Sequence, residues 1–532
     1  MNVIICLVSA LASAAVARYY LHMLQLESYQ LDGYIRWLKK NHDRHLGPTL
    51  SIGVGATAAY YVLWLLLRML MSDTASRITA GVVTLIGFLA AAFLLDRQLH
   101  GQPEKKPMAY TPRMRRLYAC LCLIALALAF LLSAVGIPAY ILFVGVPYLA
   151  LAAGGAMTPV EKAVNNYYLN DARAKLDARP DLIKIGITGS YGKTSTKFIL
   201  ATILSEKYDV LATPASFNTP MGLTRVIREK LEDHHQVFIA EMGARHAGDI
   251  KELVDLVHPT MGLITSVGPQ HLETFGSIET VANTKFELIE GLPRDGKAFF
   301  ASDGGEVDKL FQRARVKKFL TGTRGMGLDM KAEDIAVGRG GSKFTLKDGE
   351  TGEKIACETK LLGRHNIGNI VLACCAARQM GLSLEEIARG VRKIEPVEHR
   401  LQLLPGANGV TVIDDAFNSN PVGAKAALDV LAAFEGRHVI VTPGMVEQGA
   451  QEREINRQFG AQMAGKCDEI ILVGRRHTQP IVEGLRAAGV DASHIYVTGS
   501  LEEATGVLGR IGLPGDVVLF ENDLPDNYNE AQ

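Results

Sequence analysis

The sequence lacks several signals that mark common classes of protein. Its 532 residues include 56 basic and 56 acidic side chains, so no net charge favours binding to nucleic acid. The seven cysteines form neither a C-x-x-C metal pair nor a disulfide-rich pattern, which favours reduced thiols in the cytoplasm. No G-x-G-x-x-G follows a predicted strand in the C-terminal part, so we expect no dinucleotide site there. A Ser/His/Asp motif for nucleophilic catalysis is also absent.

The first 155 residues carry long apolar runs that the rest of the chain lacks. Five of these runs approach the length that a membrane-spanning helix needs. They cover about residues 2–17, 49–71, 79–95, 117–135 and 137–153. We interpret the first run as an uncleaved anchor, because it lacks the basic segment of a signal peptide. The runs contain almost no ionisable residues, which argues against a transporter.

Lysine and arginine predict how this region is oriented. Six of them lie in 96–116 and four in 24–48, whereas 72–78 carries one and 136–138 none. The positive-inside rule puts both basic segments, and everything after residue 155, in the cytoplasm. The segment 24–48 also mixes aromatic and charged residues, as either an interfacial helix or a solvated connector would. We therefore predict a multi-pass protein of the cell membrane with its later domains in the cytoplasm, and membrane lipid as a partner.

The later domains are organised around residues 183–197. A β-branched run ends in a turn with glycines at 186, 189 and 192, and a helix is predicted from Ser195 through Ile203. Such a turn points N–H groups at an anion, and the helix N-terminus adds positive charge. Lys193 would reach the β- and γ-phosphates of ATP, and the Thr194 hydroxyl would ligate magnesium. The predicted ATP-binding residues are Gly189, Ser190, Tyr191, Gly192, Lys193, Thr194 and Ser195.

This phosphate-loop pattern is narrower than the usual G-x-x-x-x-G-K-[ST]. Ile187 stands where that pattern has its first glycine. A glycine-rich turn without a ligand is therefore the alternative interpretation.

Two further predicted strands end in polar residues. Val237 to Ala240 is followed by Glu241, and Met261 to Val267 is followed by a segment that ends in His271. Because parallel α/β sheets bind ligands at the carboxyl ends of their strands, Glu241 and His271 are expected in the same crevice as Lys193. Glu241 would hold the magnesium of the nucleotide, and His271 would ligate a second ion or contact phosphate. A helix N-terminal carboxylate and a core histidine are the alternatives.

The alternation of strands and helices defines the predicted fold class, which is α/β. Transmembrane helices (1–155) are followed by a connecting helix (156–180), a P-loop ATPase-like central domain with a parallel sheet (181–396) and a Rossmann-like C-terminal domain (397–532). The connecting helix is predicted to begin at Thr158-Pro159-Val160-Glu161, which has the pattern of a capping box. It would end at about Leu176, before Arg179-Pro180.

Several blocks, in order along the chain, resemble the Mur ligases. The nearest branch is the one that adds D-alanyl-D-alanine to the peptidoglycan precursor, the MurF type. The matching blocks are residues 186–197, 241–250, 268–277, 282–285, 363–369, 398–402 and 414–421, within a region of about 181–520. They include Gly363-Arg364-His365-Asn366, Glu398-His399-Arg400 and Asp414-Asp415-Ala416.

The resemblance implies roles for individual residues. Thr194 and Glu241 would hold one magnesium ion, and His271 with Lys285 a second, Lys285 carrying a carbamate. Without the resemblance, Lys285 would be an ordinary helix lysine. The further residues it implies are His365, Asn366 and Asn369 at the adenine, and Arg400 and Asp415, which reach back to the nucleotide from the C-terminal domain. The catalytic set is then Lys193, His271, Lys285, Arg400 and Asp415.

The resemblance also implies an activity. ATP would phosphorylate a carboxylate, and an amine would attack the resulting acyl phosphate. Phosphate would then be expelled and an amide bond would form. The expected partners are ATP, a carboxylate-bearing envelope precursor, and an amino acid or dipeptide amine.

Two departures from the family leave other functions open. Membrane runs replace the uridine-binding domain of soluble members, and residues 521–526 are acidic where the branch has a basic Lys-Gly-Ser-type stretch. A ligase acting on a polyglutamate or folate-glutamate chain, and a nucleotide-regulated scaffold without catalysis, are the alternatives.

Overall fold

The chain forms two compact units, which we describe separately. The computed structural model describes residues 2–100, 107–214, 217–269, 272–338, 340–406, 409–416, 420–446 and 451–523. One unit is built from the chain up to Asn166, and the other from Tyr167 onward. The boundary lies inside a single helix, α6 (Val146–Asp177).

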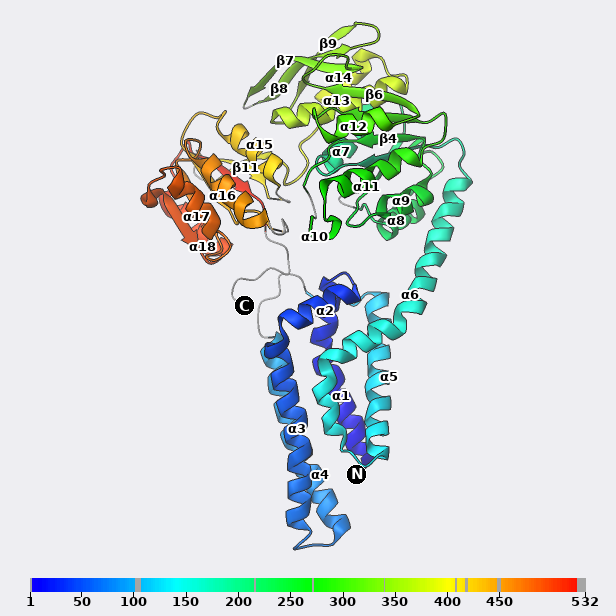
Figure 1. Ribbon diagram of the computed structural model, residues 1–532, viewed down its shortest axis with the longest axis vertical. Coiled ribbons are helices and arrows are strands. Elements are labelled where there is room, and N and C mark those ends of the chain that lie inside the picture. The colour runs from blue at the N-terminus through cyan, green and yellow to red at the C-terminus, as the bar shows by residue number, and fades with distance from the viewer. Residues whose placement is uncertain are drawn as a thin grey trace. The chain divides into compact units, whose positions relative to one another are not determined.

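The first unit is helical in the part of the chain that is described (Figure 1). Before α6 it contains α1 (Asn2–Leu26), α2 (Leu31–Lys40), α3 (His42–Leu67), α4 (Asp73–His100), α5 (Pro112–Ala134) and the 3-10 helix η1 (Ala139–Gly145). In the part of the chain that the structure describes, five stretches are long and apolar enough to cross a membrane: Val3–Leu26, His45–Leu67, Asp73–His100, Pro112–Ala134 and Ala139–Asp177. They follow the five predicted runs in order, so the prediction of five long apolar helices is confirmed.

Polar contacts tie the two predicted cytoplasmic segments together at one end of this helical bundle. The Gln25 amide donates to the Ala109 carbonyl at 2.8 Å and accepts from the Ala109 N–H at 3.0 Å. The Arg116 guanidinium donates twice to Glu161, at 2.8 and 3.0 Å, and Glu161 is only 6% exposed. At the other end, the Tyr61 hydroxyl donates to the Gly136 carbonyl at 2.9 Å. Which side of a membrane this end faces stays a prediction.

The predicted start of the connecting helix was wrong. Thr158 and Pro159 lie inside α6, which runs without interruption from Val146 to Asp177. The Thr158 hydroxyl donates to the Gly154 carbonyl at 2.9 Å, as in a helix interior, and does not cap. Glu161 binds Arg116, so it does not close a capping box. The contact with Arg116, which lies in α5, takes the carboxylate that a cap at Thr158 would need, and the helix continues through Pro159.

The second unit contains two β-sheets with helices on their faces (Figure 1). The first has nine strands: β1 (Ile183–Thr188), β2 (Val210–Ala212), β3 (Val237–Glu241), β4 (Met261–Ile264), β5 (Lys297–Ala301), β6 (Lys317–Gly322), β7 (Met330–Gly338), β8 (Gly341–Asp348) and β9 (Lys354–Thr359). Its helices are α7 (Lys193–Leu204), α8 (Pro220–Lys230), α9 (Asp249–Val257), α10 (Leu272–Phe275), α11 (Ile278–Glu290), α12 (Glu306–Arg313), α13 (Arg364–Gln379) and α14 (Leu384–Arg392).

The strand order of this sheet brings the predicted site segments to one edge. The order is β2-β3-β1-β4-β5-β6-β7-β8-β9, parallel from β2 to β7 and antiparallel beyond. Strand β1 lies between β3 and β4, with Ile187 beside Glu241 and Thr188 beside Ile264. The loop after β1, the end of β3 and the loop after β4 therefore meet at their carboxyl ends, which confirms the parallel-sheet central domain.

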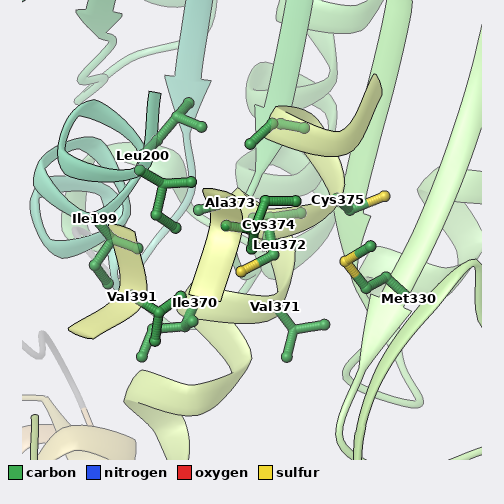
Figure 2. Close-up of a cluster of buried hydrophobic side chains, with 14 of the residues drawn as sticks. Ile199, Leu200, Met330, Ile370, Val371, Leu372, Ala373, Cys374, Cys375 and Val391 are labelled. Atoms are coloured by element: carbon green, nitrogen blue, oxygen red, sulfur yellow. The ribbon is translucent and has the colours of Figure 1, made fainter. Parts of the chain in front are cut away.

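A shared core fixes the helix that follows the phosphate loop. Ile199, Leu200, Ile203 and Leu204 of α7 are buried at helical spacing, which gives the helix one apolar face. Figure 2 shows Ile199 and Leu200 beside Ile370 of α13 and Val391 of α14. The first turn of α7 is thus held by packing on its later turns.

The second sheet carries the C-terminal part of the chain. Its strands are β10 (Gln402–Pro405), β11 (Thr411–Asp415), β12 (His438–Thr442), β13 (Glu469–Val473), β14 (Ile495–Thr498) and β15 (Val517–Glu521). The order is β10-β11-β15-β12-β13-β14, with only β10 antiparallel to its neighbour among these strands. Its helices are α15 (Pro421–Leu431), α16 (Glu452–Met463), α17 (Gln479–Ala487), the 3-10 helix η4 (Ala492–His494) and α18 (Leu501–Ile511). The predicted α/β fold class is confirmed.

Candidate functional site

The phosphate loop is clamped to the end of β4. The Ser190 N–H donates to the Ser266 carbonyl at 2.8 Å. The Ser190 hydroxyl donates to the Gly268 carbonyl and accepts from the Gly268 N–H, each at 3.0 Å. The Tyr191 hydroxyl donates to the Pro269 carbonyl at 2.6 Å. The side chains of these two predicted ATP-binding residues therefore hold the loop in place.

Lys193 lies over the loop that it follows. Its Nζ donates to the Gly189 carbonyl at 2.6 Å and to the Ser190 carbonyl at 3.2 Å. Gly192 caps α7 with a φ of 79°, and the first N–H groups of a helix have no acceptor within it. Burial lowers the pKa of Lys193 to about 8; Glu241 opposes that shift and Arg400 adds to it. An ammonium beside open helix N–H groups is suited to a polyphosphate.

Glu241 is the centre of a hydrogen-bond network at the end of β3. Its Oε1 accepts from the Thr194 hydroxyl and from the Asn218 amide, each at 3.1 Å. Its Oε2 accepts from Lys197 Nζ at 2.9 Å, and this ion pair is buried, with side-chain exposures of 0% for Lys197 and 1% for Glu241. Burial lowers the pKa of Lys197, and Glu241 opposes that shift. Thr194 and Glu241, which are predicted to hold one magnesium ion, are thus in direct contact.

Lys285 is a buried lysine on α11. It is 3% exposed, and no described residue forms an ion pair or hydrogen bond with it. Burial, reinforced by the charge of Lys193, holds the pKa of Lys285 well below its usual value. A neutral, nucleophilic amine at this position is the state that carbamate formation requires.

The two carboxylates that end β11 hold the linker that carries Arg400. Asp414 Oδ2 lies 2.7 Å from His399 Nδ1, and Asp415 Oδ1 accepts from the Leu401 N–H at 3.2 Å. His399 and Leu401, on either side of Arg400, have positive φ values of 58° and 47°. Burial raises the pKa of Asp415 to about 6, and Arg400 opposes this shift. Both carboxylates therefore fix the residues that flank Arg400.

The residues predicted at the adenine begin α13. The Asn366 amide donates to the Leu362 carbonyl at 2.8 Å. The Asn369 carboxamide lies against Gly192, since a Cβ on that glycine would meet Asn369 Oδ1 at 2.7 Å. Loss of hydration among the surrounding protein groups, reinforced by the positive charge of Arg400, lowers the pKa of His365 to about 4. Part of the His365 side chain still contacts solvent.

A small pocket joins the phosphate-loop helix to the Arg400 linker. Ser195 and Phe198 of α7, Asn366 of α13 and Arg400 all contribute to its wall. Lys193, Glu241, His365 and Asp415 are electrostatic neighbours of Arg400. The structure thus brings together the predicted residues of both domains.

One predicted residue, His271, lies outside the described residues. Among the residues described, no group of three or more His, Cys, Asp or Glu side chains is arranged to hold a metal. The metal-ligand prediction therefore rests on oxygen donors at Thr194 and Glu241 and on Lys285.

Sequence reasoning missed Lys197, Asn218, His399 and Asp414. Lys197 alone had a local signal, because it lies on the apolar face of α7, three and seven residues before the buried Leu200 and Leu204. A charge on that stripe needs a buried partner.

Comparison with known proteins identifies the family. A model of the Mur ligase middle domain matches residues 187–377, and one of the "Mur ligase, glutamate ligase domain" matches residues 399–521. The UDP-N-acetylmuramoyl-tripeptide-D-alanyl-D-alanine ligase of Mycobacterium tuberculosis (strain ATCC 25618 / H37Rv) is 35% identical over 364 residues, which are 63% of this chain and 69% of that protein. This chain belongs to the Mur ligase family.

Further relatives of this Mur ligase define its branch. The enzyme of the same name from Bacillus subtilis (strain 168) is 31% identical over 297 residues, 55% of this chain and 62% of that protein. A crystal structure of MurF from Acinetobacter baumannii has a TM-score of 0.60 at 25% identity, covering 67% of this chain and 77% of that one. MurF from Thermotoga maritima in complex with ADP has the same fold, with a TM-score of 0.61 at 24% identity, over 68% and 81% of the chains. The chain is of the MurF type.

The match is partial in length. This Mur ligase spans less than two thirds of the Bacillus subtilis relative, at 62%. The two matched segments include all the predicted site residues, from Gly189 to Asn369 and from Arg400 to Asp415, and neither includes the apolar helices.

Proposed function

We propose that this chain is a membrane-anchored, ATP-dependent ligase that joins a carboxylate to an amine in peptidoglycan precursor synthesis. The observation that carries the proposal is the constellation of Lys193 on a clamped phosphate loop, Glu241 bonded to Thr194, and the buried Lys285, in a chain of the MurF type. Its relatives are named as ligases that join D-alanyl-D-alanine to UDP-N-acetylmuramoyl-tripeptide.

The proposed reaction has two steps. A substrate carboxylate oxygen attacks the γ-phosphorus of ATP, forming an acyl phosphate and releasing ADP. The amine then attacks the acyl carbon, loses a proton, and expels phosphate to leave an amide. Lys193 and the N–H groups at the start of α7 stabilise the charge that moves onto the phosphate oxygens. Arg400 adds positive charge from the linker, and Asp415 positions that linker through the Leu401 N–H.

The residues present fit the magnesium and carbamate that the family implies. The carboxylate of Glu241 and the hydroxyl of Thr194, 3.1 Å apart, are the hard oxygen donors that magnesium prefers. Lys285 fits a carbamate because it is buried, has a lowered pKa and neighbours the Lys193 cation. The negative charge of a carbamate on Lys285 would offset the positive charge of Lys193. When bound, magnesium supplies charge neutralisation at the phosphates.

The apolar helices support membrane anchoring and a lipid-linked carboxylate substrate. Among the residues described, five helices are long enough to span a bilayer, and the described parts of both basic segments lie at one end of their bundle. The positive-inside rule puts that end, and the ligase domains, in the cytoplasm, where ATP is available. Since these helices lie outside the segments shared with the family, we propose that they replace the uridine-binding domain of soluble members. They would hold the carboxylate substrate through its lipid.

The test is ADP release by the detergent-solubilised protein with magnesium. The panel pairs nucleotide-linked or lipid-linked muramyl peptides, or a γ-linked glutamate chain, with D-alanyl-D-alanine or a single amino acid. We expect release that requires one carboxylate and one amine, and that Lys193→Ala abolishes while the exposed Lys230→Ala leaves it intact. ADP binding without turnover on any pair would favour a nucleotide-regulated scaffold.

A further inference from the structure

The buried Lys197–Glu241 pair is the most tightly enclosed ion pair among the residues described. Lys197 Nζ lies 2.9 Å from Glu241 Oε2, and both side chains are at most 1% exposed. The same ammonium lies 4.6 Å from the centre of the Phe198 ring. A lysine buried this completely is rare and needs a partner that stays charged. Its position is therefore set by the carboxylate that the proposed function gives to magnesium.

The two oxygens of Glu241 have different partners. Oε1 accepts from the Thr194 hydroxyl and the Asn218 amide, which are neutral and partly exposed groups. Oε2 accepts from the Lys197 ammonium. A metal ion at Oε1 would share one carboxylate with a full positive charge on Oε2.

Further cations surround this carboxylate. Lys193 and Arg400 both interact electrostatically with Glu241. Among the described groups of the site, Asp415 is the other acid that interacts with Arg400. Among the described groups, three cations thus act on the carboxylate of Glu241: Lys193, Lys197 and Arg400. Repulsion between like charges at short range is strong where water is excluded.

We propose that Lys197 closes the Glu241 site to free divalent cations, so that magnesium enters only together with the nucleotide. This inference rests on the proposed function, because it concerns the metal that Glu241 would hold. The phosphates of the nucleotide supply the negative charge that the empty site lacks, and they bring their own oxygen ligands. A neutral side chain at position 197 would fill the same volume without this effect. Lys197 is then a positioning and selectivity residue for the metal.

The test measures the Mn²⁺ that stays with the protein, with and without ADP, by equilibrium dialysis across a membrane that passes ADP, so that Mn²⁺ bound to free ADP does not count as bound. Wild type is expected to bind Mn²⁺ only when ADP is present. Lys197→Met, which keeps an unbranched side chain one atom shorter and removes the charge, is expected to bind Mn²⁺ without ADP, on the order of 100-fold more tightly than wild type. Lys230→Met changes an exposed lysine of α8 and is expected to behave as wild type. Lys197→Gln is the second neutral variant, should the first fail to fold.

The outcomes separate this inference from the ligase itself. Mn²⁺ binding by wild type without ADP overturns the inference, and that arm needs no variant. A folded Lys197→Met or Lys197→Gln that gains no affinity also overturns it. Failure of wild type to bind Mn²⁺ even with ADP overturns both the inference and Glu241 as a metal ligand. ADP release with substrates, measured on the same preparation, reports independently whether the protein is a ligase.

Discussion

Replacing Gly192 by alanine tests whether the phosphate loop and the predicted adenine residues form one unit. Gly192 has a φ of 79°, and an added Cβ would lie 2.7 Å from Asn369 Oδ1. The left-handed backbone alone costs an alanine about 1–2 kcal/mol. The contact adds a second effect, because the Asn369 carboxamide must turn away to make room.

The matched control is Gly248→Ala. Gly248 caps α9 as Gly192 caps α7, with a φ of 90°, but an added Cβ would meet nothing within 4 Å. Both variants are therefore expected to lose about 1–2 kcal/mol of unfolding free energy from backbone strain. Only Gly192→Ala displaces Asn369, which removes a hydrogen-bonding group worth about 1 kcal/mol, or roughly fivefold to tenfold in affinity for ADP.

The assays are thermal unfolding and calorimetric titration with ADP. We expect similar losses of stability in the two variants and a weaker affinity for ADP in Gly192→Ala alone. Adding Asn369→Gly to Gly192→Ala should remove the steric conflict without restoring affinity. If Gly192→Ala binds ADP as tightly as Gly248→Ala, the placement of Asn369 at the nucleotide is refuted.

Four further predictions address other parts of the molecule. Because only the protonated Lys193 attracts phosphate and its pKa is about 8, the affinity for ADP in calorimetric titrations should fall as the pH rises through 8. Lys193→Arg should remove that fall. An unchanged decline in Lys193→Arg would contradict the assignment of Lys193 to the phosphates. Lys285→Ala should be inactive and regain part of its ADP release with a small carboxylic acid, whereas full activity without any addition would refute the carbamate. His399→Phe loses the 2.7 Å contact with Asp414 and should lower kcat about tenfold or more, with little change in KM for ATP. His399→Asn keeps a hydrogen-bond donor and should recover part of the lost kcat. Equal kcat in wild type and both variants would show that the contact does not position Arg400. Single cysteines in 96–116, placed in a variant without the native thiols, should react only with reagents that reach the cytoplasm, and labelling from outside would overturn the orientation.

Local sequence patterns predicted the elements whose causes lie within a few residues. The β-branched run at 183–188, the glycine turn and the Lys-Thr start of α7 follow from backbone preferences and helix periodicity. The apolar runs identified five helices for the same reason, since length and hydropathy are properties of a segment alone. Placing Glu241 beside the loop needed only the rule that parallel strands meet at their carboxyl ends.

Local patterns misjudged α6 because its competing interactions come from elsewhere in the chain. The Thr158-Pro159-Val160-Glu161 pattern would start a helix if Glu161 were available to cap. Arg116, 45 residues earlier, binds Glu161 instead, and the helix continues through the proline.

Tertiary structure alone decided the partners within the site. Lys197 and Glu241 are 44 residues apart in the chain, and Ser190 and Gly268 are 78 apart, so their pairing follows from the strand order β3-β1-β4 and not from any local pattern. His399 and Asp414 meet because β10 turns back antiparallel to β11. Local patterns therefore indicated which side chains could carry chemistry, and the fold set which charges face one another, because electrostatic contacts depend on distance in space and burial from water.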